Sequence, residues 1–193
     1  MISYGMRGVG LFPLWVLANS LSGTLSSGIV KTLWGALGLF IVPPLITAAM
    51  QWLVLRRFVA HGGWWLLASL LGFGMALPVF GAAFGMGVGL WGEESWLTLI
   101  VGCLAFGTIV GVPQWYFLKD QAAHAGWWVL ASIVGLCPAI VIFVVVTRGF
   151  DVGVPGAAAA GALGGCLYGI VTGTVLVRLI PGESLKIVRI RAH

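Results

Sequence analysis

Six apolar runs follow one another along the chain, and the short breaks between them carry most of the charged residues. A run of about 20 apolar residues crosses a bilayer as a helix, because lipid offers the backbone amides no other hydrogen-bond partner. The runs predict transmembrane helices over residues 9–30, 34–55, 64–86, 96–118, 127–147 and 155–180. We therefore expect an all-α integral membrane protein, a single domain over residues 1–193 that ends in a tail at 181–193.

Composition indicates the same class. Of the 193 residues, 60% are hydrophobic and 8% are charged, with a mean hydropathy of +1.09, whereas a soluble domain carries roughly 25% charged residues. Such a chain could not keep a water-exposed surface, and we expect no nucleic-acid partner. The sequence contains no nucleophile paired with a base, no phosphate loop, no dinucleotide fingerprint and no metal-ligand spacing. We therefore expect neither enzyme activity nor a bound metal.

The distribution of basic residues orients the predicted bundle. Eight of the ten lysines and arginines fall on the side that holds both termini, namely Arg7, Arg56, Arg57, Lys119, Arg178, Lys186, Arg189 and Arg191. The other side has Lys31 and Arg148, together with three of the five acids. Because basic loops stay on the cytoplasmic side of a membrane, we expect both termini in the cytoplasm.

One phrase occurs twice in the chain. Residues 51–69 read QWLVLRRFVAHGGWWLLAS and residues 114–132 read QWYFLKDQAAHAGWWVLAS, with 11 of 19 positions identical at an offset of 63. Each copy covers the end of one predicted helix, a short loop and the start of the next helix. The repeating unit is therefore a helix that begins with a WxLAS phrase, a loop, and a returning helix that ends with QWxxL and a basic residue.

A third, weaker copy completes the pattern. Residues 15–20 read WVLANS, which aligns to WxLAS with one extra residue. In the last predicted helix, residues 169–177 read GIVTGTVLV, which aligns Thr172 with Gln51 and Gln114. Units with an even number of helices all enter the membrane the same way round. We expect three parallel-repeat two-helix hairpins in a six-helix bundle with approximate threefold symmetry.

Glycines recur at every fourth position in two of the predicted helices, where they leave a face that a neighbouring backbone can approach closely. One row comprises Gly81, Gly85 and Gly89, and the other comprises Gly161, Gly165, Gly169 and Gly173. We predict that both rows serve helix packing within the chain. Because the second row is long, a helix of another subunit is the alternative partner.

Aromatic and basic residues gather at the expected cytoplasmic boundary, where seven of the ten tryptophans fall. An aromatic belt accounts for tryptophans at both boundaries of a membrane but not for this asymmetry. Tryptophans interleaved with basic side chains suit anionic lipid heads or flat conjugated ligands. The candidate lipid- or pigment-binding residues are Gln51, Trp52, Arg56, Arg57, His61, Trp64, Trp65, Gln114, Trp115, Lys119, His124, Trp127 and Trp128.

Two pairs within this set have alternative roles. Gln51 and Gln114 lie roughly 7 Å below the boundary, at 1.5 Å per helical residue. Each either bonds to an adjacent helix or loop, contacts a ligand such as a polar lipid head, or takes part in transport. His61 and His124 occupy matching loop positions. They are either solvated or helix-capping residues, or ligands of the magnesium of a chlorophyll or of a haem iron.

The QWxxLR and WWxLAS phrases resemble those of uncharacterised multi-pass membrane proteins from cyanobacteria and filamentous phototrophic bacteria, over most of the chain from Trp15 to Arg178. The resemblance implies a bacterial cytoplasmic or photosynthetic membrane and an accessory role beside an energy-converting complex. A chlorophyll-type pigment or a carotenoid is the cofactor that such a role suggests, although the residues themselves require none. The second copy departs from the pattern at Lys119-Asp120, and the third lacks the glutamine and the WW pair.

Two functions from different classes follow. The first is a non-catalytic accessory or structural subunit that binds other integral membrane subunits and holds anionic lipid or pigment at an inner-leaflet Trp/Arg surface. The alternative is a small-solute transporter or channel with a path along the pseudo-threefold axis. Ionisable residues usually mark such paths, and the centres of the predicted helices have essentially none. A neutral path would be lined by Asn19, Thr24, Thr47, Thr108 and Thr172.

Overall fold

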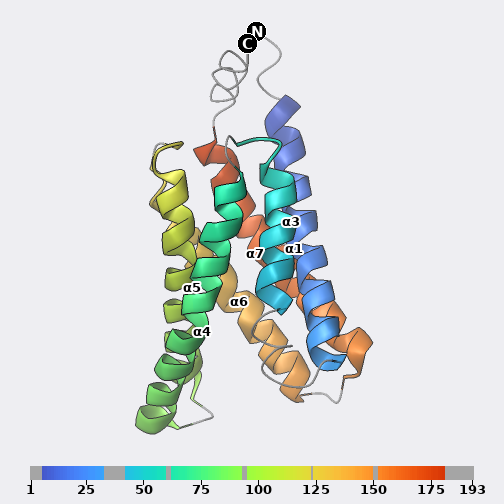
Figure 1. Ribbon diagram of the computed structural model, residues 1–193. Coiled ribbons are helices and arrows are strands. Elements are labelled where there is room, and N and C mark those ends of the chain that lie inside the picture. The colour runs from blue at the N-terminus through green and yellow to red at the C-terminus, as the bar shows by residue number, and fades with distance from the viewer. Residues whose placement is uncertain are drawn as a thin grey trace.

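The computed structural model describes residues 6–32, 42–59, 62–92, 95–122, 124–149 and 152–180, and all regular structure in these ranges is α-helical. The helices are α1 (Met6–Thr32), α3 (Val42–Leu55), α4 (Gly63–Trp91), α5 (Trp96–Leu118), α6 (Trp127–Gly149) and α7 (Val154–Leu179) (Figure 1). The predicted all-α class is confirmed for the described residues. Within these residues, three stretches are long and apolar enough to cross a membrane, namely Gly63–Leu90, Trp96–Leu118 and Val154–Leu179.

The helix limits follow local signals in the sequence. α5 begins after Ser95, whose Oγ accepts a hydrogen bond from the backbone N–H of Leu97 at 3.2 Å. α7 has Pro155 in its first turn, where a backbone N–H would have no helical partner. α4 continues beyond the predicted limit at 86 and ends before Gly92, which has the positive φ of 87° that glycine tolerates. The predicted start of the second helix at 34 lies outside the described residues.

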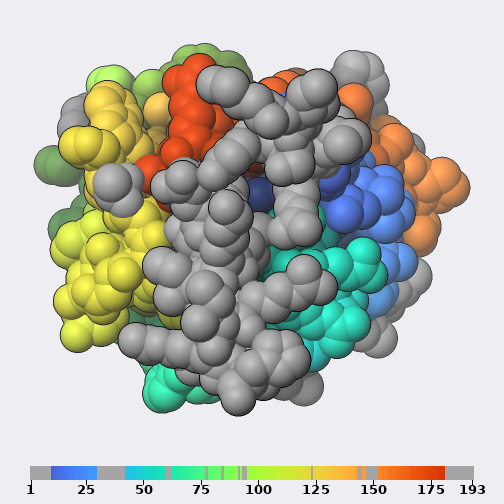
Figure 2. Space-filling model, turned by 90° about the horizontal axis from the view of Figure 1, so that it is seen from above, coloured from blue at the N-terminus to red at the C-terminus, as the bar shows by residue number. Residues whose placement is uncertain are grey.

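The helices form a ring in sequence order. Each helix packs against the next one along the chain, and α1 packs against α7, which closes the ring. Seen from above, α1 in blue adjoins α7 in orange (Figure 2). The start of α1, the end of α7 and the α3–α4 and α5–α6 turns all lie at one end of the bundle (Figure 1). We call this the basic end, after its exposed residues Arg56, Arg57, Lys119 and Arg178.

Ten polar side chains of the described residues are buried, among them Gln51, Gln114 and Thr172, whereas large apolar side chains cover the outside of the bundle. On α1, the exposed residues Leu17, Leu21 and Leu25 alternate with the buried residues Ser22 and Ser26. In water, exposing these leucines would be unfavourable because of the hydrophobic effect. In a bilayer the leucines contact lipid chains, which are as apolar as they are. The exposed faces of the described helices are therefore suited to lipid.

The glycine row on α7 packs against α1. A Cβ atom at Gly161 would overlap the carbonyl of Gly23, and one at Gly165 would overlap the carbonyl of Asn19. The other two glycines of the row also face α1, one turn apart. The two backbones approach this closely only because these positions lack side chains. The row that the sequence assigns to helix packing thus contacts a helix of the same chain.

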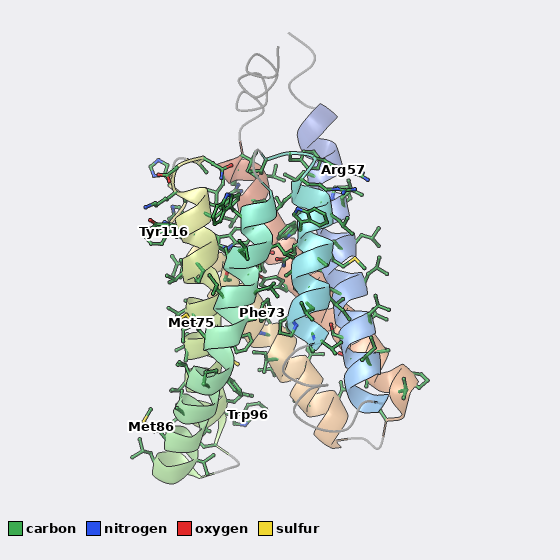
Figure 3. The ribbon with its side chains drawn as sticks, in the orientation of Figure 1. Arg57, Phe73, Met75, Met86, Trp96 and Tyr116 are labelled. Carbon is green, nitrogen blue, oxygen red and sulfur yellow. The ribbon has the colours of Figure 1, made fainter. Side chains whose placement is uncertain are left out.

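The glycine row on α4 lies in a different environment. A Cβ atom at Gly81, Gly85 or Gly89 would meet no atom within 4 Å. The ends of α4 and α5 far from the basic end diverge from α1 and α3 (Figure 1), and Met86 on this stretch points outward (Figure 3). The packing within the chain that we expected for this row is therefore not found among the described residues, because no other helix reaches this face.

α4 instead packs against α5 through other residues. Phe73 and Phe80 of α4 make edge-to-face contacts with Phe106 of α5, at centroid distances of 5.9 and 5.8 Å (Phe73 is labelled in Figure 3). Near the far end, a Cβ atom at Gly87 would stand 3.0 Å from the Cα atom of Thr98. Aromatic pairs and close glycine contacts, among them that of Gly72 with Val110, hold the two helices together as a unit.

Candidate functional site

Three tryptophans meet at the centre of the ring. Trp15 of α1, Trp65 of α4 and Trp128 of α6 are fully buried, and each contacts the other two edge-to-face. Trp15 lies 5.9 Å from each of the others, and the other two lie 5.3 Å apart, between ring centroids. Such pairs contribute about 0.5–1.5 kcal/mol each beyond the area that they bury. We call these residues the tryptophan triad; together they fill the centre of the bundle at their level.

Each indole N–H of the triad donates to a side chain on the helix that precedes it in the ring. The three bonds are Trp65 Nε1 to Gln51 Oε1 at 3.2 Å, Trp128 Nε1 to Gln114 Oε1 at 2.9 Å, and Trp15 Nε1 to Thr172 Oγ1 at 2.9 Å. Thr172 accepts an indole bond as the two glutamines do, which agrees with its alignment to them. The three bonds lie around the triad, and each links one pair of neighbouring helices: α3 with α4, α5 with α6, and α7 with α1. We call them the circle of bonds.

The glutamine amides make a second set of bonds. Gln51 Nε2 donates to Asn19 Oδ1 at 2.8 Å, and Gln114 Nε2 donates to Ser69 Oγ at 2.9 Å. Asn19 and Ser69 each follow a triad tryptophan by four residues, so the two bonds are equivalent. The extra residue that the alignment assigned to WVLANS is therefore not needed here, because Asn19 rather than Ser20 takes the serine position.

The third copy satisfies its polar groups differently. Ser132 Oγ donates to the carbonyl of Trp128 at 2.9 Å, and Thr172 Oγ1 donates to the carbonyl of Tyr168 at 2.6 Å. The side chains of Ser132 and Gln51 lie beside the Tyr168 hydroxyl. Tyr168 is buried, with 6% of its area exposed, and its ring would be 2.9 Å from a Cβ atom at position 135 of α6. Thr172 is shorter than the glutamines at the equivalent positions and has no amide that could bond to a further helix. Tyr168 thus brings a second polar group of α7 to this level.

Close backbone approaches repeat at equivalent positions. Gly111 of α5 lies against Val129 and Ser132, one and four residues after Trp128. Gly169 of α7 lies in the same way against α1, at the residues one and four positions after Trp15. Four residues after each indole acceptor, towards the basic end, the helix carries a fully buried leucine; these leucines are Leu55, Leu118 and Leu176. The contact between α7 and α1 therefore has the same register as the contact between α5 and α6.

The bonds described above form one network, and the hydrogen-bonding groups of the triad and of the two glutamines all have partners within it. All three indole N–H groups and both glutamine amides are bonded, and neither glutamine has any exposed area. Leaving one such buried group without its partner costs about 1–3 kcal/mol. The bonds fit the interpretation of Gln51 and Gln114 as links between adjacent helices. A ligand could reach them only by separating the triad.

Burial divides the residues that the sequence places on one lipid- or pigment-binding surface. Trp65, Trp128, Gln51 and Gln114 are fully buried and cannot belong to it. Successive helical residues point about 100° apart, so one tryptophan of each WW pair faces the centre when the other faces outward. The members that keep some exposed area are Trp52, Arg56, Arg57, Trp64, Trp115, Lys119, His124 and Trp127.

Cations and aromatic rings are in contact at the basic end. The guanidinium of Arg56 lies 5.1 Å from the centre of the Trp52 ring, and Lys119 Nζ lies 3.7 Å from the centre of the Tyr116 ring. Figure 3 shows Arg57 and Tyr116 on opposite sides of the bundle. The contact of Arg56 with Trp52 and that of Lys119 with Tyr116 therefore lie on two separate surfaces.

Of the two matching loop histidines, the structure describes His124. His124 is exposed, has a positive φ of 59°, and accepts a hydrogen bond at its carbonyl from the N–H of Trp127 at 3.1 Å. It is therefore a turn residue at the start of α6. His61 lies outside the described residues.

Several members of the network were not among the predicted site residues. They are Trp15, Asn19, Ser69, Ser132, Tyr168 and Thr172, of which Asn19 and Thr172 enter the sequence prediction only as lining of the alternative transport path. Both complete copies separate the glutamine from the buried tryptophan by 14 residues, and the alignment already matched Trp15 to Trp65. That spacing is the signal that could have indicated the circle, whereas nothing in the sequence indicates Tyr168.

No protein-family model, curated protein or solved structure matches the chain. Across the described ranges, no group of three or more histidine, cysteine, aspartate or glutamate side chains is arranged to hold a metal ion. Functional inference therefore depends on the geometry of the network and of the two surfaces at the basic end.

Proposed function

We propose that the protein is a non-catalytic accessory or structural subunit of a larger membrane assembly. In this proposal six transmembrane helices form three parallel hairpins, and both termini are cytoplasmic. The exposed tryptophan and basic side chains of the basic end bind lipid of the inner leaflet. The observation that carries the proposal is the set of indole and glutamine bonds around the tryptophan triad, because these bonds commit the central polar groups to linking neighbouring helices.

The recurrence of contacts supports the hairpin arrangement. The indole bond occurs three times, and Gly111 and Gly169 make equivalent approaches to the next helix in the ring. Three copies of one hairpin, each packed on the next in the same way, would produce this recurrence. Arg56, Arg57, Lys119 and Arg178 at one end support a cytoplasmic position for that end.

The exposed part of α4 supports association with another subunit. Gly81, Gly85 and Gly89 leave one side of the helix open, and small residues allow a neighbouring helix to approach closely. Met86 and Leu90 on the same stretch are 65% and 72% exposed. A transmembrane helix of a partner subunit would gain dispersion contacts here that lipid chains make less well.

The alternative function, transport along the pseudo-threefold axis, is less well supported. A solute on that axis would have to pass the triad, whose three rings are fully buried and in mutual contact. Asn19 and Thr172, which would line such a path, are bonded to Gln51 and Trp15 instead. Transport would therefore require the circle of bonds to open.

Extraction of the full-length protein from its native membrane in a mild detergent tests the proposal. We expect integral membrane subunits to co-purify at fixed stoichiometry, and an absorption spectrum of the complex reports whether pigment is part of it. Gly85→Leu should lose the partner subunits. Ala159→Leu, at an exposed alanine of α7, is the matched control and should retain them.

Two results would contradict the proposal. One is a particle that carries no partner when extracted from native membrane under conditions that keep other complexes intact. The other is uptake of small solutes by liposomes that contain only this protein, at a rate proportional to the amount reconstituted. The second result would favour the transporter.

A further inference from the structure

A groove on the outside of the bundle runs between α4 and α5, beginning at the basic end. It has a volume of about 980 Å³ and is lined by Trp64, Leu67 and Leu71 on α4 and by Pro113 and Tyr116 on α5. This volume is at the upper limit of about 300–1,000 Å³ found for small-molecule sites. The lining is apolar except at one end. Such a groove suits a molecule with a long apolar part and a small polar head.

The polar end of the groove is built by the α5–α6 turn. The carboxylate-bearing residue Asp120 lines the groove, and both Asp120 and Lys119 are exposed. The ammonium of Lys119 lies over the Tyr116 ring, at 3.7 Å from its centre. Adjacent opposite charges therefore stand at the end of the groove that lies at the headgroup level.

The corresponding corner of the preceding copy has a different charge. At the offset of 63, Lys119 and Asp120 correspond to Arg56 and Arg57. The first corner carries two positive charges and suits an anionic lipid head. The second corner carries one positive and one negative charge and complements a zwitterionic head.

We propose that this groove is a binding site for a zwitterionic phospholipid with a primary ammonium group, of the phosphatidylethanolamine class. The inference rests on the proposed lipid-binding role of the basic end. The ammonium head donates hydrogen bonds to the Asp120 carboxylate, the phosphate faces Lys119, and one acyl chain follows the groove past Leu67 and Leu71. A phosphatidylcholine head has no N–H to donate. The Tyr116 face that could receive its quaternary ammonium is already covered by Lys119.

Native mass spectrometry of the purified, delipidated full-length protein provides the test. The protein is titrated separately with phosphatidylethanolamine, phosphatidylcholine and phosphatidylglycerol that share the same acyl chains. We expect the first binding site to prefer phosphatidylethanolamine over phosphatidylcholine by about threefold, the size expected for one exposed charge pair. Asp120→Asn should remove this preference.

Variants of the groove wall measure the contribution of the acyl chain to binding, apart from that of the head group. Leu67→Trp fills the groove and should weaken binding of phosphatidylethanolamine by about tenfold, because the chain loses its apolar contacts. Leu130→Trp is the matched control, since Leu130 is the equivalent residue of α6, is similarly exposed (51% against 49%) and does not line the groove. Thermal unfolding of both variants verifies that each is folded.

Three results would overturn the inference. These are equal binding of phosphatidylethanolamine and phosphatidylcholine by the unmodified protein, tightest binding of phosphatidylglycerol at the site that Leu67→Trp blocks, and equal effects of Leu67→Trp and Leu130→Trp. None of them bears on partner subunits or on solute uptake. The subunit proposal and the lipid site can therefore fail independently.

Discussion

Thr172 and Thr174 lie two residues apart on α7, and only Thr172 belongs to the network. Each hydroxyl donates to the carbonyl four residues before it, at 2.6 Å for Thr172 and 2.7 Å for Thr174. Thr172 is fully buried and also accepts from Trp15, whereas Thr174 is exposed. The pair isolates the contribution of a single bond in the circle.

Replacing each threonine by valine keeps the shape and removes the hydroxyl. We expect Thr172→Val to lower the free energy of unfolding by about 1–2 kcal/mol, because the Trp15 indole loses its acceptor. Thr174→Val should change it by less than about 0.5 kcal/mol. Unfolding in mixed detergent micelles, followed by circular dichroism, measures both values. Equal destabilisation by the two variants would mean that the Trp15 bond contributes nothing.

The WW pair at positions 64 and 65 provides a second residue-scale prediction. Trp65→Phe removes the donor to Gln51 and shrinks the ring that contacts both other tryptophans of the triad, and we expect a loss of about 2–3 kcal/mol in unfolding free energy. Trp64→Phe, at a side chain that is 63% exposed, should stay within about 0.5 kcal/mol of the unmodified protein. Tryptophan emission distinguishes them further, since loss of the buried ring should shift the remaining emission to longer wavelength. A larger effect from Trp64 would contradict the assignment of Trp65 to the core.

At the scale of the helix, the two glycine rows have the same spacing and opposite surroundings. The α7 row meets the α1 backbone, and the α4 row meets no atom of the chain within 4 Å. The spacing alone could not distinguish them, because it specifies a smooth face and not the element that covers that face.

Alanine substitutions convert this contrast into a measurement. Gly165→Ala places a methyl group into the carbonyl of Asn19, and we expect a loss of about 1–3 kcal/mol or more from overpacking. Gly85→Ala meets open space and should leave the isolated protein unchanged or more stable by up to about 1 kcal/mol, through helix propensity. Thermal unfolding of the isolated protein in detergent compares them. Destabilisation by Gly85→Ala would indicate that the α4 row packs within the chain.

At the scale of the whole molecule, we propose that the positive charges of the basic end set the orientation in the membrane. We expect single cysteines at Arg57 and Asp120 to react with a membrane-impermeant thiol reagent only from the cytoplasmic side. A cysteine at Ser95, in the turn at the other end, should react only from outside. The three native cysteines, Cys103, Cys137 and Cys166, are replaced by alanine for this measurement. Labelling of Asp120→Cys in intact cells would show that the basic end lies outside the cell, which is the opposite orientation.

The fold could be predicted largely from the sequence because helix length and membrane thickness are coupled. Apolar runs such as 96–118 predicted α5 at its observed limits. The candidate surface was predicted less well. The sequence identified Trp64, Trp65 and Gln51 as notable together, but which of them faces the centre depends on the rotation of α4 and on its neighbours.

What the sequence by itself determined is therefore the all-α class, the presence of helices apolar enough to span a membrane, and the equivalence of Gln51, Gln114 and Thr172. These follow from local composition and from repetition, which a single chain displays without reference to its partners. The tertiary structure decided that Trp15, Trp65 and Trp128 meet, that Tyr168 supplements Thr172, and that the α4 glycines remain uncovered. The physical reason is that a side chain's partner is set by which helices adjoin and how each is rotated. Helix neighbours and helix rotations are defined only after the helices have packed and α1 has met α7.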